Sequence, residues 1–330
     1  MTLDEIYIEI KKSENFVILT HENPDGDAIG SALSVALLLK KMGKNVVDIY
    51  LKDYPEIYNF LPGIEMIKKD IDKDNYDMAI VVDCSDIIRV NQMYRYLFEK
   101  ADIKVQFDHH NNNSMFADYN IVNPVSPACS QIMSSSFEYL KIDIDKDMAT
   151  AILTGIITDT YGFSIPETTT ESFEFAGYAL SKGVNVSRVY RNALTKISKA
   201  RFNIQNLASE RLEFLADGKI CFTYITKQDE QKIGTKTGDL SSIVEIGRNI
   251  DGVEISIFLY EKEKGFKVSI RTNEYVDASI ICLALGGGGH LRAAGANIMK
   301  NNEEINLELA KKLVIEESIK YLKSENIWTE

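Results

Sequence analysis

The segment HENPDGDAIGS, at residues 21–31, brings one imidazole and two carboxylates close together in the sequence. His21 is followed by Asp25 and Asp27, with a proline and a glycine between them that bend the chain. An Asx-turn that continues into a helix N-cap would explain one of these aspartates, but not both together with a histidine. The residue types therefore indicate a site for a divalent metal ion, whose usual ligands include imidazole nitrogen and carboxylate oxygen.

More acidic and imidazole residues stand where other apolar segments end. Asp83 follows MAIVV, Asp159 follows ILTGIIT, and Asp108, His109 and His110 follow KVQF. A single carboxylate in such a position is more often a helix cap than a ligand. If all of these groups met at one edge of a sheet, they would repel one another and would be costly to desolvate unless cations neutralised them. Paired metal ions are the simplest neutraliser.

The ligand types also favour a particular metal and reaction. Mixed imidazole and carboxylate ligands suit manganese or another hard-to-borderline divalent ion. The four cysteines lie far apart and form no CxxC pair, which argues against structural zinc and indicates reduced intracellular thiols. Two metal ions can activate water and hold both oxygens of an in-line displacement at phosphorus. The sequence therefore predicts hydrolysis of a phosphoester.

The spacing of these residues predicts a parallel β-sheet. In the first half of the chain, short β-branched runs alternate with longer amphipathic stretches, which is the pattern of βαβ units. Strands are expected at residues 16–19, 46–50, 78–82 and 104–107, and helices at 28–42 and from near Ser126. A further apolar segment at 149–157 leads into Asp159. The candidate residues then lie at the carboxyl ends of strands, where open α/β sheets bind ligands.

The second half of the chain has a different sequence pattern. A charged, strand-poor stretch at 188–211 is expected to be a linking helix, followed by strands at 219–225, 253–260 and 266–271 and helices at 239–249 and 302–323. The charged turn EKEKG between the last two strands predicts a hairpin. We therefore expect a catalytic domain at 1–186, a linker helix at 187–211 and a smaller α/β domain at 212–330.

A run of four glycines, residues 286–289, precedes His290 in the second half. The N–H groups of Gly287, Gly288 and Gly289 could form an anion nest, and Arg271 could bind a phosphate bidentately. The rival interpretation is a flexible hinge loop. The run lacks the Lys-Ser/Thr of a P-loop and the spacing of a dinucleotide fingerprint, so it implies neither ATP nor NAD.

Composition restricts the class of partner. The 330 residues are 45% hydrophobic, which is typical of a folded protein, and carry a net charge of -12. Long nucleic acid bound by a basic surface is therefore disfavoured, and anionic partners should be small. The N-terminus lacks the features of a signal peptide, and no segment is apolar enough to span a membrane, so a cytoplasmic protein with no membrane partner is expected.

Four segments together resemble the motifs of the DHH phosphoesterase family. They are HENPDGDAIGS, VVDCSD, FDHH and TGIITDTYGF, in that order and spacing, while VSIRTN and GGGGHLRAAG resemble the DHH-associated C-terminal domain. The resemblance covers residues 16–296. In its size and its lack of further domains, the chain is most similar to the stand-alone nanoRNases. The resemblance implies hydrolysis of short oligoribonucleotides to mononucleotides and removal of the 3′-phosphate of adenosine 3′,5′-bisphosphate (pAp).

The same resemblance implies roles for the candidate residues. Two divalent ions, expected to be manganese, would share Asp83 as a bridging ligand. The other implied ligands are His21 and Asp25 for one ion, and Asp27, His109 and Asp159 for the other.

Further roles are implied for residues that do not bind metal. Asp108 would orient His109 or the nucleophile, and His110 would contact the scissile phosphate or protonate the leaving oxygen. Arg271 and His290 would hold the terminal phosphate of the substrate, so that the active site lies in the cleft between an N-terminal parallel-sheet domain and a smaller α/β domain.

Other functions remain open at the level of sequence. A phosphodiesterase for cyclic di-AMP or pApA would keep the chemistry and change the substrate. A pyrophosphatase would share the first four motifs, but the glycine-rich second domain resembles the nucleotide-handling type. A nucleotide-binding regulator without catalysis is disfavoured by the intact ligand set. Gln131, Cys84 and Ser164 depart from the usual family pattern and leave the choice of substrate open. The sequence also leaves open whether the protein forms a homodimer.

Overall fold

Six parallel strands form the central sheet of the N-terminal part of the chain, in the order β3-β2-β1-β4-β5-β6. They are β1 (Asn15–Leu19), β2 (Val46–Tyr50), β3 (Ile67–Lys68), β4 (Met78–Val82), β5 (Ile103–Asp108) and β6 (Tyr119–Val122). The central strands β1 and β4 are almost continuously buried and apolar, as parallel strands covered on both faces require. Strand order reverses between β1 and β4, which creates the switch point where such sheets bind ligands.

The computed structural model describes residues 2–235, 239–240, 242–299 and 305–325, and it divides into the units Met1–Lys196 and Ile197–Glu330. The expected linker is not a single helix. Helix α7 (Val186–Tyr190) runs into a π-helix (Arg191–Thr195), and Ser198 caps a new helix, α8 (Lys199–Glu210). Helix α8 packs inside the second unit, and the expected domain boundaries at 186 and 212 stay a prediction.

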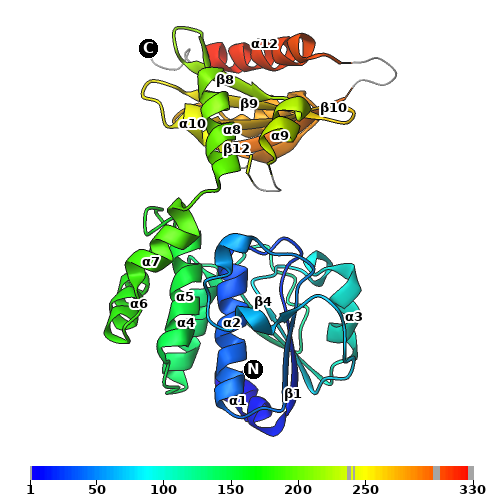
Figure 1. The fold of residues 1–330 in the computed structure, drawn as a ribbon, viewed down its shortest axis with the longest axis vertical. Coiled ribbons are helices and arrows are strands. Elements are labelled where there is room, and N and C mark those ends of the chain that lie inside the picture. Colours follow the sequence, from blue (N-terminus) through cyan, green and yellow to red (C-terminus); the bar gives the residue numbers. More distant parts are fainter. Residues whose placement is uncertain (1, 236–238, 241, 300–304, 326–330) are drawn as a thin grey trace. The chain divides into compact units, whose positions relative to one another are not determined.

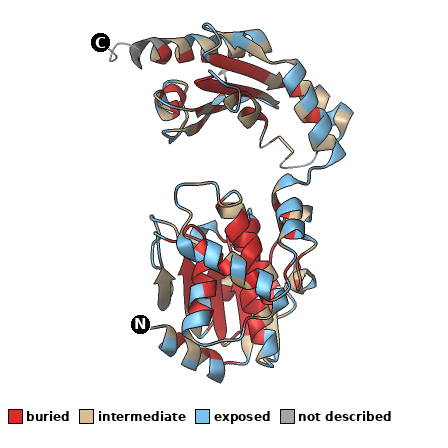
Figure 2. Cartoon of the chain, turned by 90° about the vertical axis from the view of Figure 1, so that its left-hand side faces the viewer, coloured by how far each residue is buried: buried red, intermediate tan, exposed pale blue. Residues whose placement is uncertain are grey.

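Helices cover both faces of the first sheet (Figure 1). On one face lie α2 (Gly26–Lys41), α4 (Cys129–Tyr139) and α5 (Lys146–Asp159), and on the other lies α3 (Gln92–Lys100). Helices α1 (Leu3–Lys12) and α6 (Thr170–Ser181) complete the unit together with α7. Alternate residues of β1 divide between the two cores: Phe16 and Ile18 face α2, α4 and α5, whereas Val17 and Leu19 face α3. In Figure 2 the central strands are accordingly buried, whereas the covering helices combine buried residues with exposed ones.

Helices α2 and α5 approach each other closely because glycines lie where they cross. A Cβ at Gly30 would lie 2.4 Å from the carbonyl oxygen of Ala151. A Cβ at Gly155 would lie 2.0 Å from Ser130 Oγ and 2.5 Å from Asp27 Oδ1. Gly155 therefore makes room for an acidic side chain between two helices, and an alanine there would displace it.

The predicted strands of this unit are confirmed at β1, β2, β4 and β5, whereas two helix starts were wrong by about two residues. Helix α2 begins at Gly26, not at residue 28, because the Asp25 side chain caps it. Helix α4 begins at Cys129, not near Ser126, because its first amides are capped by Asp27, a residue distant in the sequence.

The second unit contains a mixed six-stranded sheet in the order β11-β12-β10-β9-β8-β7. Its strands are β7 (Glu213–Leu215), β8 (Ile220–Ile225), β9 (Ile255–Lys262), β10 (Gly265–Thr272), β11 (Gly288–His290) and β12 (Ala293–Ile298). Only the pairing of β8 with β9 is parallel. The predicted hairpin of β9 and β10 is confirmed, and the unit has the expected α/β architecture.

Helices again cover both faces of this sheet. Helices α11 (Ala278–Ala284) and α12 (Leu307–Glu325) share one core with β9 and β10, and α8 and α10 (Ile243–Arg248) share another with β8 and β9. Helix α9 (Lys227–Ile233) follows β8. The helices expected at 239–249 and 302–323 correspond to α10 and α12, although residues 241 and 302–304 lie outside the described residues. Among the described helices, none is long and apolar enough to cross a membrane.

Candidate metal centre

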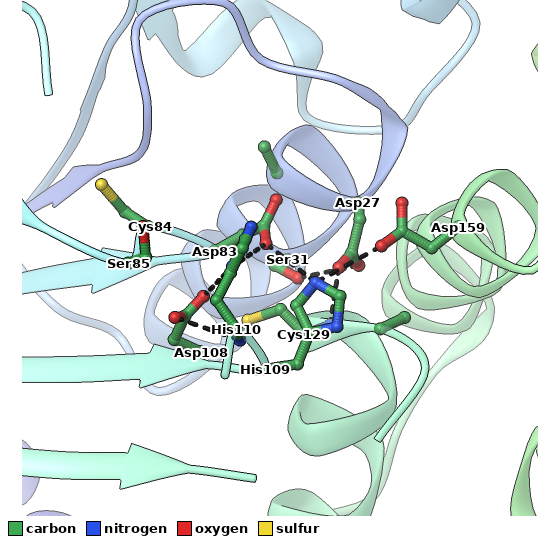
Figure 3. A network of polar contacts seen from close by, with 12 residues as sticks. Asp27, Ser31, Asp83, Cys84, Ser85, Asp108, His109, His110, Cys129 and Asp159 are labelled. Atoms are coloured by element: carbon green, nitrogen blue, oxygen red, sulfur yellow. Dashed lines mark hydrogen bonds and ion pairs between the residues drawn. The ribbon is translucent and has the colours of Figure 1, made fainter. Parts of the chain in front are cut away.

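The carboxyl ends of β1, β4 and β5 bring three of the predicted segments to one edge of the first sheet (Figure 3). His21 follows β1, Asp83 follows β4, and Asp108 ends β5 directly before His109. The edge lies beside the point between β1 and β4 where the strand order reverses. Residues up to 88 positions apart are therefore neighbours because of the sheet topology alone.

Two further carboxylates reach the same place from helices. Asp27 lies in the first turn of α2, and Asp159 is the last residue of α5. Both oxygens of Asp27 accept hydrogen bonds from the start of α4, from Cys129 N at 2.6 Å and Ser130 N at 2.8 Å. Residue 128, which precedes this helix, is an alanine and cannot cap it. Asp27 thus satisfies two amides that have no partner within the helix.

Asp25 uses one of its two carboxylate oxygens to cap a helix. Its Oδ1 accepts hydrogen bonds from Asp27 N and Ala28 N, both at 3.0 Å, and so caps α2. The N-cap interpretation of the sequence is therefore correct for Asp25, and it leaves the second carboxylate oxygen available to a ligand.

Ligand atoms from these segments form three groups, and within each group all atoms lie within 4.8 Å of one another. One group combines His21, Asp25 and Asp83, and another combines Asp27, His109 and Asp159. The third joins Asp83 and His109 to His110. All six predicted metal ligands thus meet in one place, and Asp83 is the residue that connects the two principal groups.

Asp83 lies between the histidines and is almost fully buried (Figure 3). Its Oδ2 is 3.5 Å from His21 Nε2, and its Oδ1 is 3.4 Å from His109 Nε2 and 3.7 Å from His110 Nδ1. Although burial opposes ionisation, contacts with His109 and His21 hold the pKa of Asp83 well below its usual value. Oδ1 is buried without a hydrogen-bond partner, and the backbone has φ of 50°, an unusual value for aspartate. Strain and an orphaned oxygen at one residue are typical of a ligand site.

The protonation behaviour of the second group shows an excess of negative charge. Burial and repulsion by Asp27 raise the pKa of Asp159 to about 10, and burial and repulsion by Asp83 raise the pKa of Asp27 to about 7. Burial lowers the pKa of His109, but contact with Asp83 and the other carboxylates raises it to about 10 overall. Divalent cations would relieve this repulsion, so the donor set and the orphaned Asp83 oxygen fit bound metal ions.

The two histidines of the DHH segment are oriented by different partners. His109 Nδ1 lies 3.2 Å from the carbonyl oxygen of Ser126, which can only accept, so Nε2 faces the carboxylates. Asp108 lies 2.8 Å from His110 Nδ1 and also accepts from Asn113 Nδ2 at 2.6 Å. Of the two roles expected for Asp108, orientation of His109 does not match the structure: in the described residues the ring partner of Asp108 is His110, and a backbone carbonyl holds His109. Orientation of the nucleophile stays a prediction.

Comparison with known proteins assigns the fold to a family. The family described as "DHH family, N-terminal domain" matches residues 15–156, and the DHHA1 domain matches residues 217–318. The bifunctional oligoribonuclease and PAP phosphatase NrnA of Thermus thermophilus is 31% identical over 282 residues, which cover 85% of this chain and 83% of the relative. The chain belongs to the DHH family.

Two other known proteins are similar to nearly the whole of this chain. The cyclic-di-AMP phosphodiesterase PdeA of Listeria monocytogenes is 24% identical over 96% of this chain and 49% of its own length. The crystal structure of an exopolyphosphatase-related protein from Bacteroides fragilis has a TM-score of 0.84 and 24% identity, and it covers 97% of this chain and 96% of that chain. The last comparison supports the fold and says nothing of substrate.

One residue near the metal centre of this DHH protein carried no signal in the sequence. Tyr58 comes from the segment between β2 and β3, is buried in the core, and has its pKa raised by burial and by the charges of Asp25 and Asp159. Its hydroxyl therefore lies near carboxylates of both principal groups. The segment around it has no metal-ligand spacing, so only the fold reveals it.

The three positions that depart from the family pattern have local partners. Gln131 accepts from Ser172 Oγ and donates to Thr169, and thereby ties α4 to the start of α6. The Cys84 thiol donates to the carbonyl oxygen of residue 86, and Ser164 Oγ donates to that of residue 161. These contacts explain how each residue fits its surroundings without joining the metal-binding groups.

Two predicted phosphate-binding residues of the DHHA1 domain, Arg271 and His290, lie on the strands that flank β12. Arg271 of β10 is in register with Ala293 of β12, which is in register with His290 of β11. Arg271 Nε donates to Glu245 Oε1 at 2.9 Å, so the guanidinium has an acidic partner. These two candidate side chains thus occupy one row across the sheet.

The glycine run joins α11 to β11, and the first of its three predicted nest amides is already hydrogen-bonded. Gly287 N donates to Cys282 O and closes the end of α11, whereas Gly288 and Gly289 belong to β11. A Cβ at Gly287 would lie 2.2 Å from a carbonyl oxygen of β12, and one at Gly289 would lie 2.5 Å from Ala294 Cα. Close strand packing explains these two glycines, whereas a Cβ at Gly286 or Gly288 would meet open space.

Proposed function

We propose that this protein is a metal-dependent phosphoesterase that hydrolyses short oligoribonucleotides to mononucleotides and removes the 3′-phosphate of pAp. The observation that carries the proposal is the pair of ligand groups joined by Asp83 at the switch point of the sheet. The similarity to the oligoribonuclease and PAP phosphatase of T. thermophilus over most of both chains supports the choice of substrate.

In this proposal, two manganese ions are held by the six predicted ligands. His21 and Asp25 would hold one ion, a second set of three residues would hold the other, and Asp83 would contribute to both. The second set is Asp27, His109 and Asp159. When bound, the ions make water nucleophilic toward phosphorus and neutralise charge on the phosphate.

The side chains contribute orientation and proton transfer. Asp108 fixes the His110 ring through Nδ1, and the ring stays 30% exposed, which supports a role for Nε2 in donating a proton to the leaving oxygen. The carbonyl oxygen of Ser126 keeps His109 in the tautomer that a ligand requires. Both effects depend on groups that the fold holds in place before substrate arrives.

The second unit contributes substrate selection in the proposal. Arg271 and His290, in one row of the sheet, would bind the terminal phosphate of the substrate, together with the exposed face at Gly288. Arg271 would exchange its partner Glu245 for the phosphate. The net charge of -12 favours short substrates, because binding a long strand needs a basic track.

Cyclic di-AMP or pApA is the second candidate substrate. The match to the Listeria PdeA extends over nearly the whole of this chain and favours it. Both candidates use the same proposed ligands, so the choice depends on the rest of the substrate.

The test compares initial rates of the manganese-loaded protein on pAp, a 3-mer RNA, pApA, cyclic di-AMP, pyrophosphate and a 40-mer DNA. The proposal predicts fastest turnover of pAp and the 3-mer, and fastest turnover of pyrophosphate or the 40-mer would refute it. Asp83→Asn should lower the rate at least ~10³-fold, because one charge at ~4 Å in partly buried surroundings is worth ~4 kcal/mol. Asp53→Asn, at a carboxylate that is 80% exposed, is the matched control.

A further inference from the structure

The loops that carry the candidate metal ligands are almost free of positive charge. They span residues 20–25, 83–91, 109–118 and 160–169, and Arg89 is the only lysine or arginine in them. A phosphate substrate would bring further negative charge to a site that already gathers four ligand aspartates. The position of this single cation therefore matters.

The backbone at Arg89 is fixed beside His21. The carbonyl oxygen of Arg89 accepts from Glu22 N at 2.8 Å, and His21 pairs with Val90 in an isolated bridge. Arg95 Nη2 donates to the carbonyl oxygens of the residues before and after Arg89, at 2.6 Å for Ile88 and 3.1 Å for Val90. The segment that carries Arg89 is thus tied to the first metal-binding loop and to α3.

Most N–H groups of the Arg89 guanidinium have no hydrogen-bond partner in the described residues. Its Nη1 donates to Ser85 Oγ at 3.0 Å, and within the described part of the chain this is its one side-chain hydrogen bond, with no carboxylate partner. Ser85 follows Asp83 by two positions and lies at the same strand end (Figure 3). In contrast, Arg211 is paired with Asp229 and Arg271 with Glu245.

Arg89 is held beside two of the proposed metal ligands by geometry. Its backbone bonds to the loop of His21, and its guanidinium bonds to Ser85, two positions after Asp83. The Arg89 side chain is exposed, and most of its five donors are unused.

We propose that Arg89 binds a non-bridging oxygen of the phosphate that is cleaved at the metal centre. The inference rests on the proposed function and adds the residue that balances the charge of the reacting phosphate. A planar guanidinium suits this task, since it stays charged and can donate two parallel hydrogen bonds. Because the contact is with the reacting phosphate, it serves every substrate, whether or not a terminal phosphate is present.

The test compares Arg89→Ala and Arg89→Lys with Arg188→Ala, which removes an equal charge from the exposed surface of α7. Arg89→Ala should lower kcat/KM ~10²–10³-fold on both pAp and an RNA 3-mer without terminal phosphate, the usual effect of losing one transition-state donor. Arg89→Lys should recover part of the loss, and Arg188→Ala should behave as wild type. A loss below ~3-fold, or one confined to pAp, would overturn the inference.

Calorimetry separates phosphate binding from metal binding and folding. Inorganic phosphate should bind the manganese-loaded Arg89→Ala protein at least ~10-fold more weakly than wild type, while manganese affinity and melting temperature stay unchanged. Equal phosphate affinity, or a parallel loss of manganese affinity in both Arg89 variants, would overturn the inference. If wild type bound phosphate through Arg89 but cleaved no phosphoester, the proposed function would fail and the Arg89 contact would stand.

Discussion

Replacing Asp159 by asparagine should make the metal-free protein more stable while destroying its metal site. Within the described residues, the Asp159 carboxylate has one charged partner, His109 Nε2 at 3.4 Å, and no hydrogen bond. Burial and repulsion by Asp27, Asp25 and Asp83 outweigh that attraction and raise its pKa to about 10 from an ordinary value of 3.8. An asparagine keeps the shape and removes the charge.

The size of the effect follows from proton linkage. An acid whose folded pKa exceeds its unfolded value makes the folded state bind the extra proton, so its stability contribution falls as pH rises from 3.8 towards about 10. At pH 8, and at 1.36 kcal/mol per pKa unit, this penalty is at most ~6 kcal/mol. Since 22% of the side chain is exposed and the site can relax, we expect a gain of ~2 kcal/mol for Asp159→Asn, or ~4–8 °C in melting temperature.

The assay is urea unfolding of chelator-treated protein at pH 5 and pH 8, followed by melting with and without manganese. The gain from Asp159→Asn should be small at pH 5 and large at pH 8, and manganese should stabilise wild type far more than the variant. If metal-free Asp159→Asn were no more stable than wild type at pH 8, the argument from carboxylate repulsion would be refuted.

Two further predictions concern the other members of this group. Asp27→Asn should stabilise the metal-free protein at pH 8 less than Asp159→Asn does in urea unfolding. The pKa of Asp27 is raised only to about 7, and Cys129 N and Ser130 N donate to different oxygens of Asp27, only one of which an asparagine keeps. A gain equal to or greater than that of Asp159→Asn would contradict the capping role. Manganese binding should release protons and tighten as pH rises from 6 to 8, because His109 and Asp159, each with a pKa of about 10, and Asp27, with one of about 7, must lose protons to become ligands. Calorimetry in buffers of different ionisation enthalpy measures this release, and a pH-independent affinity would exclude it.

Much of the first sheet and its ligand edge could be predicted because both depend on local patterns. The run MAIVV is apolar and largely β-branched, so it forms a buried strand, and the polar residue that ends it must emerge at the strand end. The same reasoning applies to Asp108 after KVQF. Since all the strands are parallel, their carboxyl ends share one edge, and Asp83 and His109 meet there without any long-range information.

Contacts between distant segments could not be predicted in this way. The capping of α4 by Asp27 joins residues more than 100 positions apart, and it depends on how closely Gly155 lets the helices approach. Tyr58 stands in a segment without a motif, and only the fold brings it near the carboxylates. The expected glycine nest was wrong for Gly287, because its amide closes the end of α11 through Cys282 O, a contact that the glycine run itself does not reveal.

The aspartates of the candidate metal centre differ in which end of a helix they occupy, and this affects how well their negative charge is tolerated when no cation is bound. Asp25 and Asp27 accept from helix N-termini, where unpaired amides and the helix dipole favour a carboxylate. Asp159 stands at the opposite, negative end of α5, where both the dipole and its neighbours oppose ionisation. Helix termini therefore offset part of the cost of burying Asp25 and Asp27, whose pKa values are nonetheless raised, whereas the helix dipole adds to that cost at Asp159. For this reason Asp159→Asn should stabilise the apo protein more than Asp27→Asn does, although both residues belong to one ligand group.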